Sequence, residues 1–488
     1  MYDVIIIGAG VVGSLIARAL SRYRLKILLL DKAWDVGEGT TKANTAIVHA
    51  GYDAKPGTLK AKLNVAGNAL YDQVCGELDV DFERCGTYVV ALSSEELPLL
   101  EELRARGREN GVPGLSILSA EEMFRREPAL NPATKGALHA PGGGLVDPFG
   151  LCIGAAENAV LNGVELRLGT LVSGILRQGD EIGGVITPGG AIRARWTIIA
   201  AGLWADELMA SAGLSGFHIT PRKGEYFVLD KVAAEQVRSV LFPCPTPISK
   251  GILVTRTIHG NVLLGPNAAD VDDKEDLRTT AAGLDEVLAG ALKLVPSLDT
   301  RQVIRTFAGL RAAGSGGPVA GDFYIDIPAG TRGLLVLAGI ESPGLTASPA
   351  IAEYVVDLLR EAGLKLEERP DYNPQRRAIP RFSELSTAER EALIALDPRY
   401  GRVICRCETV TEGEIVAACH GPIPARTYDA LKRRTRVGTG RCQGAFDLPR
   451  VLQIMSRELG VSPLELTKQG PGSPFLLRRT KEVQDGAV

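Results

Sequence analysis

The sequence predicts an α/β protein in which a parallel sheet is interrupted by an antiparallel domain and followed by a small helical domain that bears cysteines. Three observations support this prediction. The chain begins with a short apolar strand, a glycine-rich turn and an amphipathic helix, and the same pattern returns at residues 333–359. Four of the eight cysteines lie within residues 405–442. The repeated pattern indicates one interrupted domain; two independent domains in series are the alternative.

The opening turn has the spacing of a dinucleotide-binding loop. Residues 4–7 form an apolar run that is long enough for a buried strand and too short for a helix. Gly8, Gly10 and Gly13 follow in G-x-G-x-x-G spacing. The first glycine allows a tight turn, the second lets a pyrophosphate approach the backbone, and the third lets the next helix pack closely on the sheet.

The elements after this turn complete a β–α–β unit. A helix is expected over about residues 11–21, and the N–H groups at its first turn would bind phosphate oxygens. The next strand, about residues 26–30, ends at Asp31, whose carboxylate can accept hydrogen bonds from ribose hydroxyls. The loop at residues 37–52 is rich in Gly, Thr and Asn and suits a phosphate or a polar ring.

Composition and charge exclude several classes of function. The chain has 488 residues, 45% of them hydrophobic and 23% charged, which is ordinary for a globular protein with a large core. A net charge of −3 gives no support for nucleic-acid binding. No apolar run approaches the ~20 residues of a transmembrane helix, and the N-terminus does not resemble a signal peptide. We therefore expect a cytoplasmic protein, with peripheral docking at the inner face of the membrane left open.

The C-terminal cysteines have the spacing of a metal or cluster site. Cys405 and Cys407 are two positions apart, and Cys442 follows after 34 intervening residues. Two thiolates at this spacing can bind one centre, and the third can close the site. A zinc site is the weaker alternative, because C-x-C differs from the C-x-x-C of common zinc ribbons.

Several motifs of this chain resemble those of FAD-dependent oxidoreductases of the D-amino-acid-oxidase-like superfamily, in the branch of the 2-hydroxyglutarate dehydrogenases and anaerobic glycerol-3-phosphate dehydrogenases. The matching segments are residues 2–31, 49–52, 56–63, 221–230, 307–311 and 339–355. The cysteine-bearing unit resembles the [2Fe–2S] domain that is related to bacterioferritin-associated ferredoxin.

The resemblance implies FAD as the cofactor and assigns residues to it. The ADP half would lie against Gly8, Gly10, Gly13 and Asp31. The pyrophosphate or flavin would lie near Thr41, Asn44 and Thr45. Independently of the resemblance, Gly202 lies at the carboxyl end of a later predicted strand and suits a sheet that binds its cofactor along several strand ends. The isoalloxazine would lie near Gly339, Gly344 and Leu345, with the positive end of a helix that starts at about Ser348 directed at the ring.

The resemblance also implies a domain division. The FAD-binding domain would comprise residues 1–80, 145–217 and 320–365, and the substrate-binding domain residues 81–144 and 218–319. A linker at 366–399, the [2Fe–2S]-type domain at 400–460 and a tail at 461–488 would follow.

Three residues are candidates for the substrate site. Arg311, in a G-L-R setting, would bind the acidic group of the substrate, because guanidinium matches carboxylate and phosphate. Tyr226 would add a hydroxyl. His49 would accept the hydroxyl proton when an alcohol is oxidised. The alternatives are a structural arginine, a core tyrosine and a histidine that serves packing.

The cysteine unit departs from the family pattern at one position. The family has a fourth cysteine five positions after the third, and here that position is Asp447. Three interpretations remain open: Asp447 is the fourth ligand, Cys419 takes its place, or the domain has lost its cluster and is structural.

We thus predict an FAD-dependent dehydrogenase that oxidises a small anionic 2-hydroxy compound, glycerol 3-phosphate before 2-hydroxyglutarate. Its electrons would pass to a partner, such as another flavoprotein subunit, a quinone or a small carrier. Amine oxidation of the glycine or opine type, and a non-catalytic subunit that relays electrons through flavin, are the alternatives.

Overall fold

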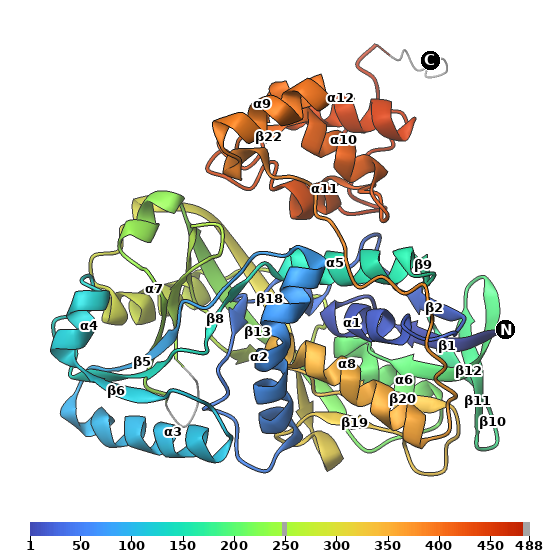
Figure 1. Cartoon of the computed structure of the whole chain (residues 1–488), viewed down its shortest axis with the longest axis horizontal. Helices are drawn as coiled ribbons and strands as arrows, with labels where there is room; N and C mark the ends of the chain where they lie inside the picture. Colours follow the sequence, from blue (N-terminus) through green and yellow to red (C-terminus); the bar gives the residue numbers. More distant parts are fainter. Residues whose placement is uncertain (246–250, 482–488) are drawn as a thin grey trace, which may run out of the picture. The chain divides into compact units, whose positions relative to one another are not determined.

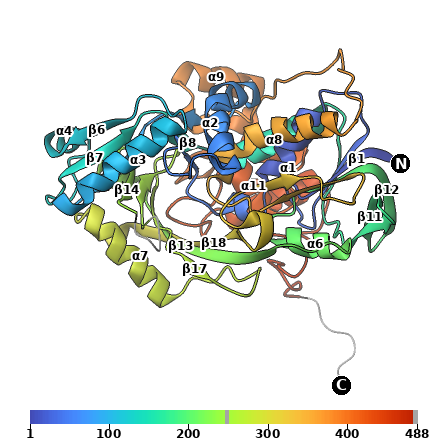
Figure 2. The same ribbon diagram turned by 90° about the horizontal axis from the view of Figure 1, so that it is seen from below.

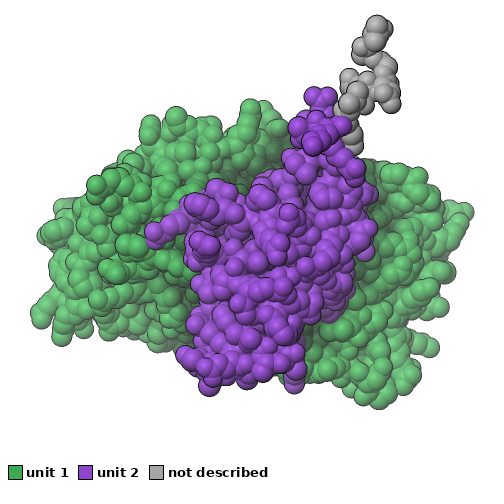
Figure 3. Space-filling model, turned by 90° about the horizontal axis from the view of Figure 1, so that it is seen from above, with its two compact units in different colours: residues 1–32, 36–376 green, residues 33–35, 377–488 purple. Residues whose placement is uncertain are grey.

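The computed structural model describes residues 1–245 and 251–481. The chain divides into two compact units, one made of residues 1–32 and 36–376 and the other of residues 33–35 and 377–488 (Figures 1 and 3). The first unit contains two large sheets, and the second is a small, mainly helical unit.

The first sheet contains eight strands among the described residues, in the order β10-β11-β12-β1-β2-β9, with β20 paired to β12 and β19 to β20. Its strands are β1 (Tyr2–Ile7), β2 (Ile27–Leu30), β9 (Glu165–Arg167), β10 (Gly174–Gln178), β11 (Glu181–Thr187), β12 (Gly190–Ile199), β19 (Tyr324–Asp326) and β20 (Leu334–Ala338). The central strands β1, β2, β12 and β20 are parallel to their neighbours in this group.

Helices cover both faces of this sheet. Ile5 and Ile7 of β1 share a buried cluster with Leu208 of α6 (Ala205–Ser211). Ile6 points the other way, toward Gly13 of α1 (Val11–Leu20). Helix α1 packs between α5 (Pro148–Leu161) and α8 (Gly344–Glu361), as Figure 1 shows. Burial on both faces explains why residues 4–7 of the first strand are all apolar.

The two glycine-rich turns lie at one edge of this sheet. In the register of the parallel strands, Ile7 lies beside Ile199, and Ile199 lies beside Val336. The carboxyl ends of β1, β12 and β20 therefore point the same way, toward the turns that begin at Gly8 and Gly339. This topology confirms the prediction that the opening pattern and the late pattern belong to a single sheet.

The second sheet contains nine described strands in the order β17-β13-β16-β15-β14-β5-β7-β6, with β18 paired to β13. Its strands are β5 (Thr87–Ala91), β6 (Ser116–Ser119), β7 (Gly136–Ala140), β13 (His218–Leu229), β14 (Val240–Pro243), β15 (Val254–Arg256), β16 (Val262–Leu264), β17 (Ala269–Asp270) and β18 (Val303–Ser315). Val90 packs on the side of α7 (Ala281–Leu294), and Val89 packs on the side of α3 (Leu97–Glu109), so helices cover both faces (Figure 2). Helix α4 (Ala120–Arg126) begins with a capping box formed by Ser119 and Glu122.

A small three-stranded sheet connects these regions. It consists of β3 (Ile47–Val48), β8 (Gly144–Val146) and β4 (Phe82–Glu83). The strands of the first large sheet all come from the segments predicted to bind FAD, and those of the second from the segments predicted to bind substrate. Both sheets lie in one compact unit, so the predicted division between them stays a prediction.

Helix α8 begins earlier than the sequence suggests. We expected its start at about Ser348, but it begins at Gly344 and continues through Pro349. Proline lacks the N–H that would bond to the Leu345 carbonyl. That oxygen instead accepts hydrogen bonds from Tyr71 Oη at 2.6 Å and Ser348 Oγ at 2.7 Å. A side chain from another helix therefore makes the early start possible.

Tyr71 belongs to α2 (Leu59–Leu78), which packs closely against α8. A Cβ atom on Gly67 of α2 would lie 2.2 Å from the Thr346 carbonyl oxygen. Because real Cβ atoms do not approach oxygen so closely, only glycine fits at this crossing.

The second unit contains a two-stranded sheet and four described α-helices. Its elements are α9 (Thr387–Leu396), β21 (Val403–Cys405), β22 (Val410–Thr411), α10 (Glu412–His420), α11 (Tyr428–Thr435) and α12 (Leu448–Leu459). The predicted linker therefore contains one helix. Residues 33–35 group with this unit, where the buried Asp35 carboxylate accepts hydrogen bonds from Arg433 and Arg434 at 2.7–2.8 Å.

In the part of the chain that the structure describes, no helix has both the length and the apolar character needed to cross a bilayer.

Candidate active site

The opening turn is built so that only glycine fits at two positions. Gly8 has a φ of +105°, and a Cβ atom there would lie 2.4 Å from the Ala200 carbonyl oxygen. A Cβ atom on Gly13 would lie 1.9 Å from the Gly8 carbonyl oxygen. The Asp31 carboxylate accepts a hydrogen bond from the Ala9 N–H at 2.7 Å and so holds the turn at the end of β2. These contacts produce the close backbone arrangement that a pyrophosphate requires.

The first turn of α1 is supported by the loop at residues 40–46. Gly10 caps α1 without a side-chain hydrogen bond, and the Val11 N–H donates to Thr41 Oγ1 at 3.0 Å. The Asn44 amide donates to the Thr41 carbonyl at 2.8 Å and accepts from the Ala46 N–H at 2.8 Å. Thr41 and Asn44 thus shape the loop beside the helix N-terminus, where phosphate is favoured.

The other predicted cofactor positions lie in or near the sheet edge. Gly202 follows β12 with a φ of +55°, and a Cβ atom there would meet no atom within 4 Å. Gly339 follows β20 with a φ of +66°. Gly344 and Leu345 form the start of α8, which has no side-chain cap. Thr45, in the loop before β3, is partly exposed. The uncapped start of α8 leaves N–H groups for a polar ring at the end of the parallel sheet.

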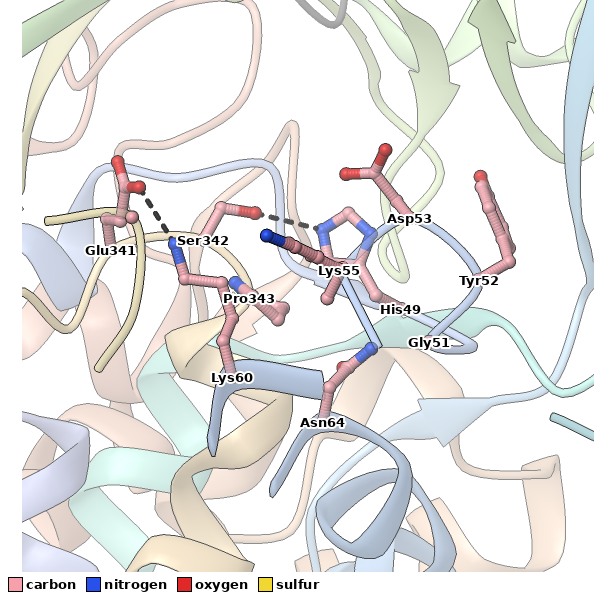
Figure 4. A pocket seen from close by; sticks show the side chains of 12 residues that line it. His49, Gly51, Tyr52, Asp53, Lys55, Lys60, Asn64, Glu341, Ser342 and Pro343 are labelled. Atoms are coloured by element: carbon pink, nitrogen blue, oxygen red, sulfur yellow. Dashed lines mark hydrogen bonds and ion pairs between the residues drawn. The ribbon is translucent and has the colours of Figure 1, made fainter. Parts of the chain in front are cut away.

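A cavity of about 210 Å³ lies between the β3–α2 segment and the turn before α8 (Figure 4). Its charged and polar lining includes His49, Asp53, Lys55, Lys60, Glu341 and Ser342. Because these side chains come from the 49–64 and 341–343 regions, the cavity adjoins the late glycine turn.

His49 is positioned through its backbone and its ring. Its N–H donates to Thr346 Oγ1 of α8 at 2.9 Å, and its Nε2 lies 3.5 Å from Ser342 Oγ. The ring packs against Phe242, with the centroids 6.0 Å apart. An imidazole held in this way in an open cavity can accept a proton from a bound hydroxyl group.

Two lysines line the cavity together with two acids, Asp53 and Glu341. Lys60 Nζ pairs with the Glu341 carboxylate at 3.0 Å, and both side chains are only partly exposed. Lys55 lines the same cavity and is exposed. Lysine is a compact point charge that suits phosphate. The sequence alone did not indicate that either lysine lines a cavity, although Lys60 lies in the 56–63 segment that carries the family resemblance.

Arg311 and Tyr226 lie together on the β13–β18 pair of the second sheet. The Arg311 guanidinium donates to the backbone carbonyls of Arg222, Lys223 and Asn267 at 3.0–3.4 Å through Nε and Nη2. Tyr226 stacks on Phe307 at 4.4 Å, and burial raises the pKa of its hydroxyl to about 12. Neither residue belongs to the described lining of the His49 cavity, so their predicted roles in substrate binding stay predictions.

The second unit brings the predicted cluster cysteines together. Cys407 Sγ lies 3.8 Å from Cys405 Sγ and 3.5 Å from Cys442 Sγ. Two thiolates on one tetrahedral centre with bonds of about 2.3 Å lie roughly 3.8 Å apart. Asp447 is buried beside them, whereas Cys419 is buried in α10. The donor set therefore fits a metal or an iron–sulfur cluster.

Comparisons with known proteins agree with both halves of this description. Residues 3–358 match the model of the family described as FAD dependent oxidoreductase. Residues 403–457 match the model described as a BFD-like [2Fe–2S] binding domain.

Individual relatives extend the similarity along the chain. A glycerol 3-phosphate dehydrogenase of Caloramator mitchellensis is 47% identical over 99% of this chain and 100% of its own length. The human mitochondrial L-2-hydroxyglutarate dehydrogenase is 27% identical over 74% of this chain and 89% of its own. The FAD-bound structure of L-α-glycerophosphate oxidase from Mycoplasma pneumoniae superposes with a TM-score of 0.72 at 32% identity, covering 77% of this chain and 98% of that one.

Proposed function

The chain belongs to the family of FAD-dependent oxidoreductases, and on this premise we propose that it oxidises the secondary alcohol of glycerol 3-phosphate to a ketone. The observation that carries the proposal is the cavity in which the His49 imidazole lies with the ammonium groups of Lys55 and Lys60. A base and a cationic pair are what a phosphorylated alcohol requires. The full-length similarity to a glycerol 3-phosphate dehydrogenase supports the same substrate.

The residues of the opening turn fit FAD, since Gly8 and Gly13 leave space that any side chain would fill. Gly10, Asp31, Thr41, Asn44 and Thr45 would contribute to the ADP and pyrophosphate end, and Gly202, Gly339, Gly344 and Leu345 would lie nearer the flavin end. When bound, FAD supplies the acceptor for the hydride that leaves the alcohol carbon.

His49 is proposed to accept the proton of the substrate hydroxyl. The Thr346 hydroxyl fixes its backbone at 2.9 Å, and Ser342 Oγ lies near Nε2 at 3.5 Å. General-base assistance of this kind contributes about 10²–10⁴-fold to rate. The two anchoring contacts come from α8 and from the turn before it, so the base is held by the same segment that is proposed to approach the flavin.

Lys55 and Lys60 are proposed to attract the phosphate, and Arg311 is retained as a candidate anchor. Glu341 pairs with Lys60 at 3.0 Å and keeps its ammonium group inside the cavity. Arg311 uses Nε and Nη2 for backbone carbonyls, and among the described residues Nη1 has no hydrogen-bond partner. Tyr226, which lies in the same strand pair as Arg311, is retained as a candidate that would contribute a hydroxyl to substrate binding.

The [2Fe–2S]-type domain favours a dehydrogenase over an oxidase, because it offers electrons a route other than dioxygen. We propose that they pass to a separate acceptor, such as a flavoprotein subunit, a quinone or a small carrier. A cytoplasmic protein, free or bound at the inner face of the membrane, would meet each of these acceptors.

The test is anaerobic mixing of the FAD-loaded protein with a substrate panel, followed by the visible absorbance of the flavin. Glycerol 3-phosphate should bleach the flavin, and glycerol should do so at least about 10²-fold less efficiently, because two charge-assisted contacts of about 1.5–3 kcal/mol each are lost. L-2-Hydroxyglutarate is included because the human relative acts on it.

Bleaching by L-2-hydroxyglutarate or by an amine such as glycine, and not by glycerol 3-phosphate, would overturn the proposed substrate. Bleaching by none of them would favour a non-catalytic flavin subunit. The Lys60→Met variant separates the two candidate anchors, since it should raise KM for glycerol 3-phosphate about 10-fold or more if the cavity holds the phosphate.

A further inference from the structure

We propose that Asp447 is the fourth protein ligand of the cluster, bound through one carboxylate oxygen while the Tyr428 hydroxyl donates a hydrogen bond to the other oxygen. The site would then contain three cysteine thiolates and one carboxylate. The proposal concerns only the second unit and is independent of the substrate proposed above.

The first argument is that Asp447 is a buried carboxylate without a cationic partner. It is 3% exposed, and within the described residues neither of its oxygens accepts a hydrogen bond from an N–H or O–H group, while the Cys405 thiol lies beside it. Burying an ionised carboxylate alone costs several kcal/mol. Two other buried acids of this unit are paired with arginines, Asp35 with Arg434 at 2.8 Å and Glu408 with Arg436 at 3.0 Å. A positively charged metal centre would supply the partner that Asp447 lacks.

The second argument is that this carboxylate faces the cysteines. The Cys405 thiol lies within hydrogen-bond reach of the Asp447 carboxylate. Cys405 is linked by the 3.8 Å contact to Cys407, which lies 3.5 Å from Cys442. All four candidate ligands therefore belong to one group, in which Cys405 and Asp447 are buried and Cys407 and Cys442 are partly exposed.

Tyr428 forms another wall of this group. Its hydroxyl is buried and, like the Asp447 carboxylate, has no hydrogen-bond partner within the described residues. A Cβ atom on Gly444 would lie 2.5 Å from Tyr428 Oη and 3.6 Å from Asp447 Oδ1. The phenol and the carboxylate thus converge at Gly444, where one donor and one acceptor lack partners. A carboxylate that binds a metal through one oxygen can accept the phenol hydrogen bond at the other.

The glycine loop makes room for such a centre. A Cβ atom on Gly440 would lie 2.6 Å from Cys407 Sγ, and one on Gly438 would lie 2.2 Å from Tyr428 Oη. Side chains at these positions would fill the space around the donor atoms.

Cys419 does not suit the fourth position. It is buried in α10, and within the described residues no contact joins its sulfur to the cysteine group. The sulfurs of Cys405, Cys407 and Cys442, by contrast, are linked by contacts of 3.5–3.8 Å. Cys419 therefore lies in different surroundings, and Asp447 is the better candidate.

The experiment uses the full-length protein purified without oxygen, as wild type and as the variants Asp447→Cys, Asp447→Ala, Cys419→Ser and Asp429→Asn. Asp429 is the matched control acid, because it is paired with Lys468 near the surface. Iron and acid-labile sulfide per chain, the visible spectrum, and the electron paramagnetic resonance of the dithionite-reduced protein are the readouts. Flavin content and far-ultraviolet circular dichroism check the fold.

We expect two irons and two sulfides per chain in the wild type, as in the domain family, and in Asp447→Cys, Cys419→Ser and Asp429→Asn. Loss of an outer-shell contact typically lowers metal affinity by about 10–100-fold. Asp447→Ala removes a direct ligand, so it should lower the affinity for the cluster by at least as much. Asp447→Cys should intensify sulfur-to-iron absorption and move the midpoint potential upward, because an oxygen donor is harder than thiolate and favours the oxidised iron.

Tyr428→Phe tests the positioning residue. It should keep both irons and shift the midpoint potential, since only the hydrogen bond to the carboxylate is removed. Three outcomes would overturn the proposal: a full cluster with an unchanged spectrum in Asp447→Ala, loss of the cluster in Cys419→Ser, or a wild-type protein that takes up zinc and no iron after reconstitution.

Discussion

Replacing His49 with asparagine tests the proposed base with little structural cost. The backbone N–H that donates to Thr346 is kept, and the ring contact to Ser342 is 3.5 Å, too long for a strong hydrogen bond. The variant should therefore fold and bind FAD. Loss of a general base should slow flavin reduction by about 10²–10⁴-fold, equivalent to roughly 3–5 kcal/mol in the barrier.

The assay is anaerobic stopped-flow reduction by glycerol 3-phosphate at saturating concentration, across a range of pH. In the wild type the acidic limb of the pH–rate profile reports the base, and this limb should be absent in His49→Asn. His218→Asn is the control, because His218 is exposed and pairs with Asp206 at 3.0 Å on the second sheet. A His49→Asn protein that is fully loaded with FAD and reduced as fast as the wild type near neutral pH would refute the reasoning.

Three further predictions concern the anchor, the cofactor turn and the second unit. Arg311→Met should lower kcat/KM by roughly 30-fold to several thousand-fold through loss of about 2–5 kcal/mol of charge pairing; thermal unfolding must be recorded as well, because the guanidinium also holds three backbone carbonyls. Gly13→Ala should abolish FAD retention, since its Cβ atom would lie 1.9 Å from a backbone oxygen, whereas Gly76→Ala, in open space, should raise stability by about 0.5–1 kcal/mol. Burial alone would raise the pKa of Asp35, but the guanidinium groups of Arg434 and Arg433 outweigh burial and lower this pKa. The ionised carboxylate therefore stabilises the fold at pH values above the unfolded pKa of about 3.9, and this stabilisation is lost as the pH falls through the pKa of the folded state. Asp35→Asn should accordingly destabilise the second unit by about 3–5 kcal/mol near pH 7, as measured by hydrogen exchange of α11. The difference in stability between the variant and the wild type should become smaller below about pH 4.

The parts of the fold that follow local rules were predictable. The strand at residues 4–7, the three glycines and the following helix each carry their own signal, because turn geometry and apolar periodicity depend on neighbouring residues. The capping box at Ser119 and Glu122 is equally local, and the structure contains it. The cysteine spacing predicted a site, and the structure brings all three sulfurs together.

The features that escaped prediction depend on contacts between distant segments. Lys60 and Glu341 are 281 positions apart, and no local pattern indicates that they pair in one cavity with His49. The early start of α8 depends on the Tyr71 hydroxyl, 274 positions before Leu345. A proline near the start of a helical pattern indicates that the helix begins at about that proline. An earlier start can be predicted only if the hydrogen bond from the distant tyrosine is known.

The tight crossing at Gly67 has a consequence for how the enzyme tolerates change. Gly67 faces the carbonyl of Thr346, the residue whose hydroxyl fixes the backbone of His49. A larger residue on α2 would push the two helices apart and carry His49, the proposed base, away from the proposed flavin site. A methyl group added outside the cavity would thus misalign the proposed base with the proposed flavin site. Every side chain of the cavity would still be present.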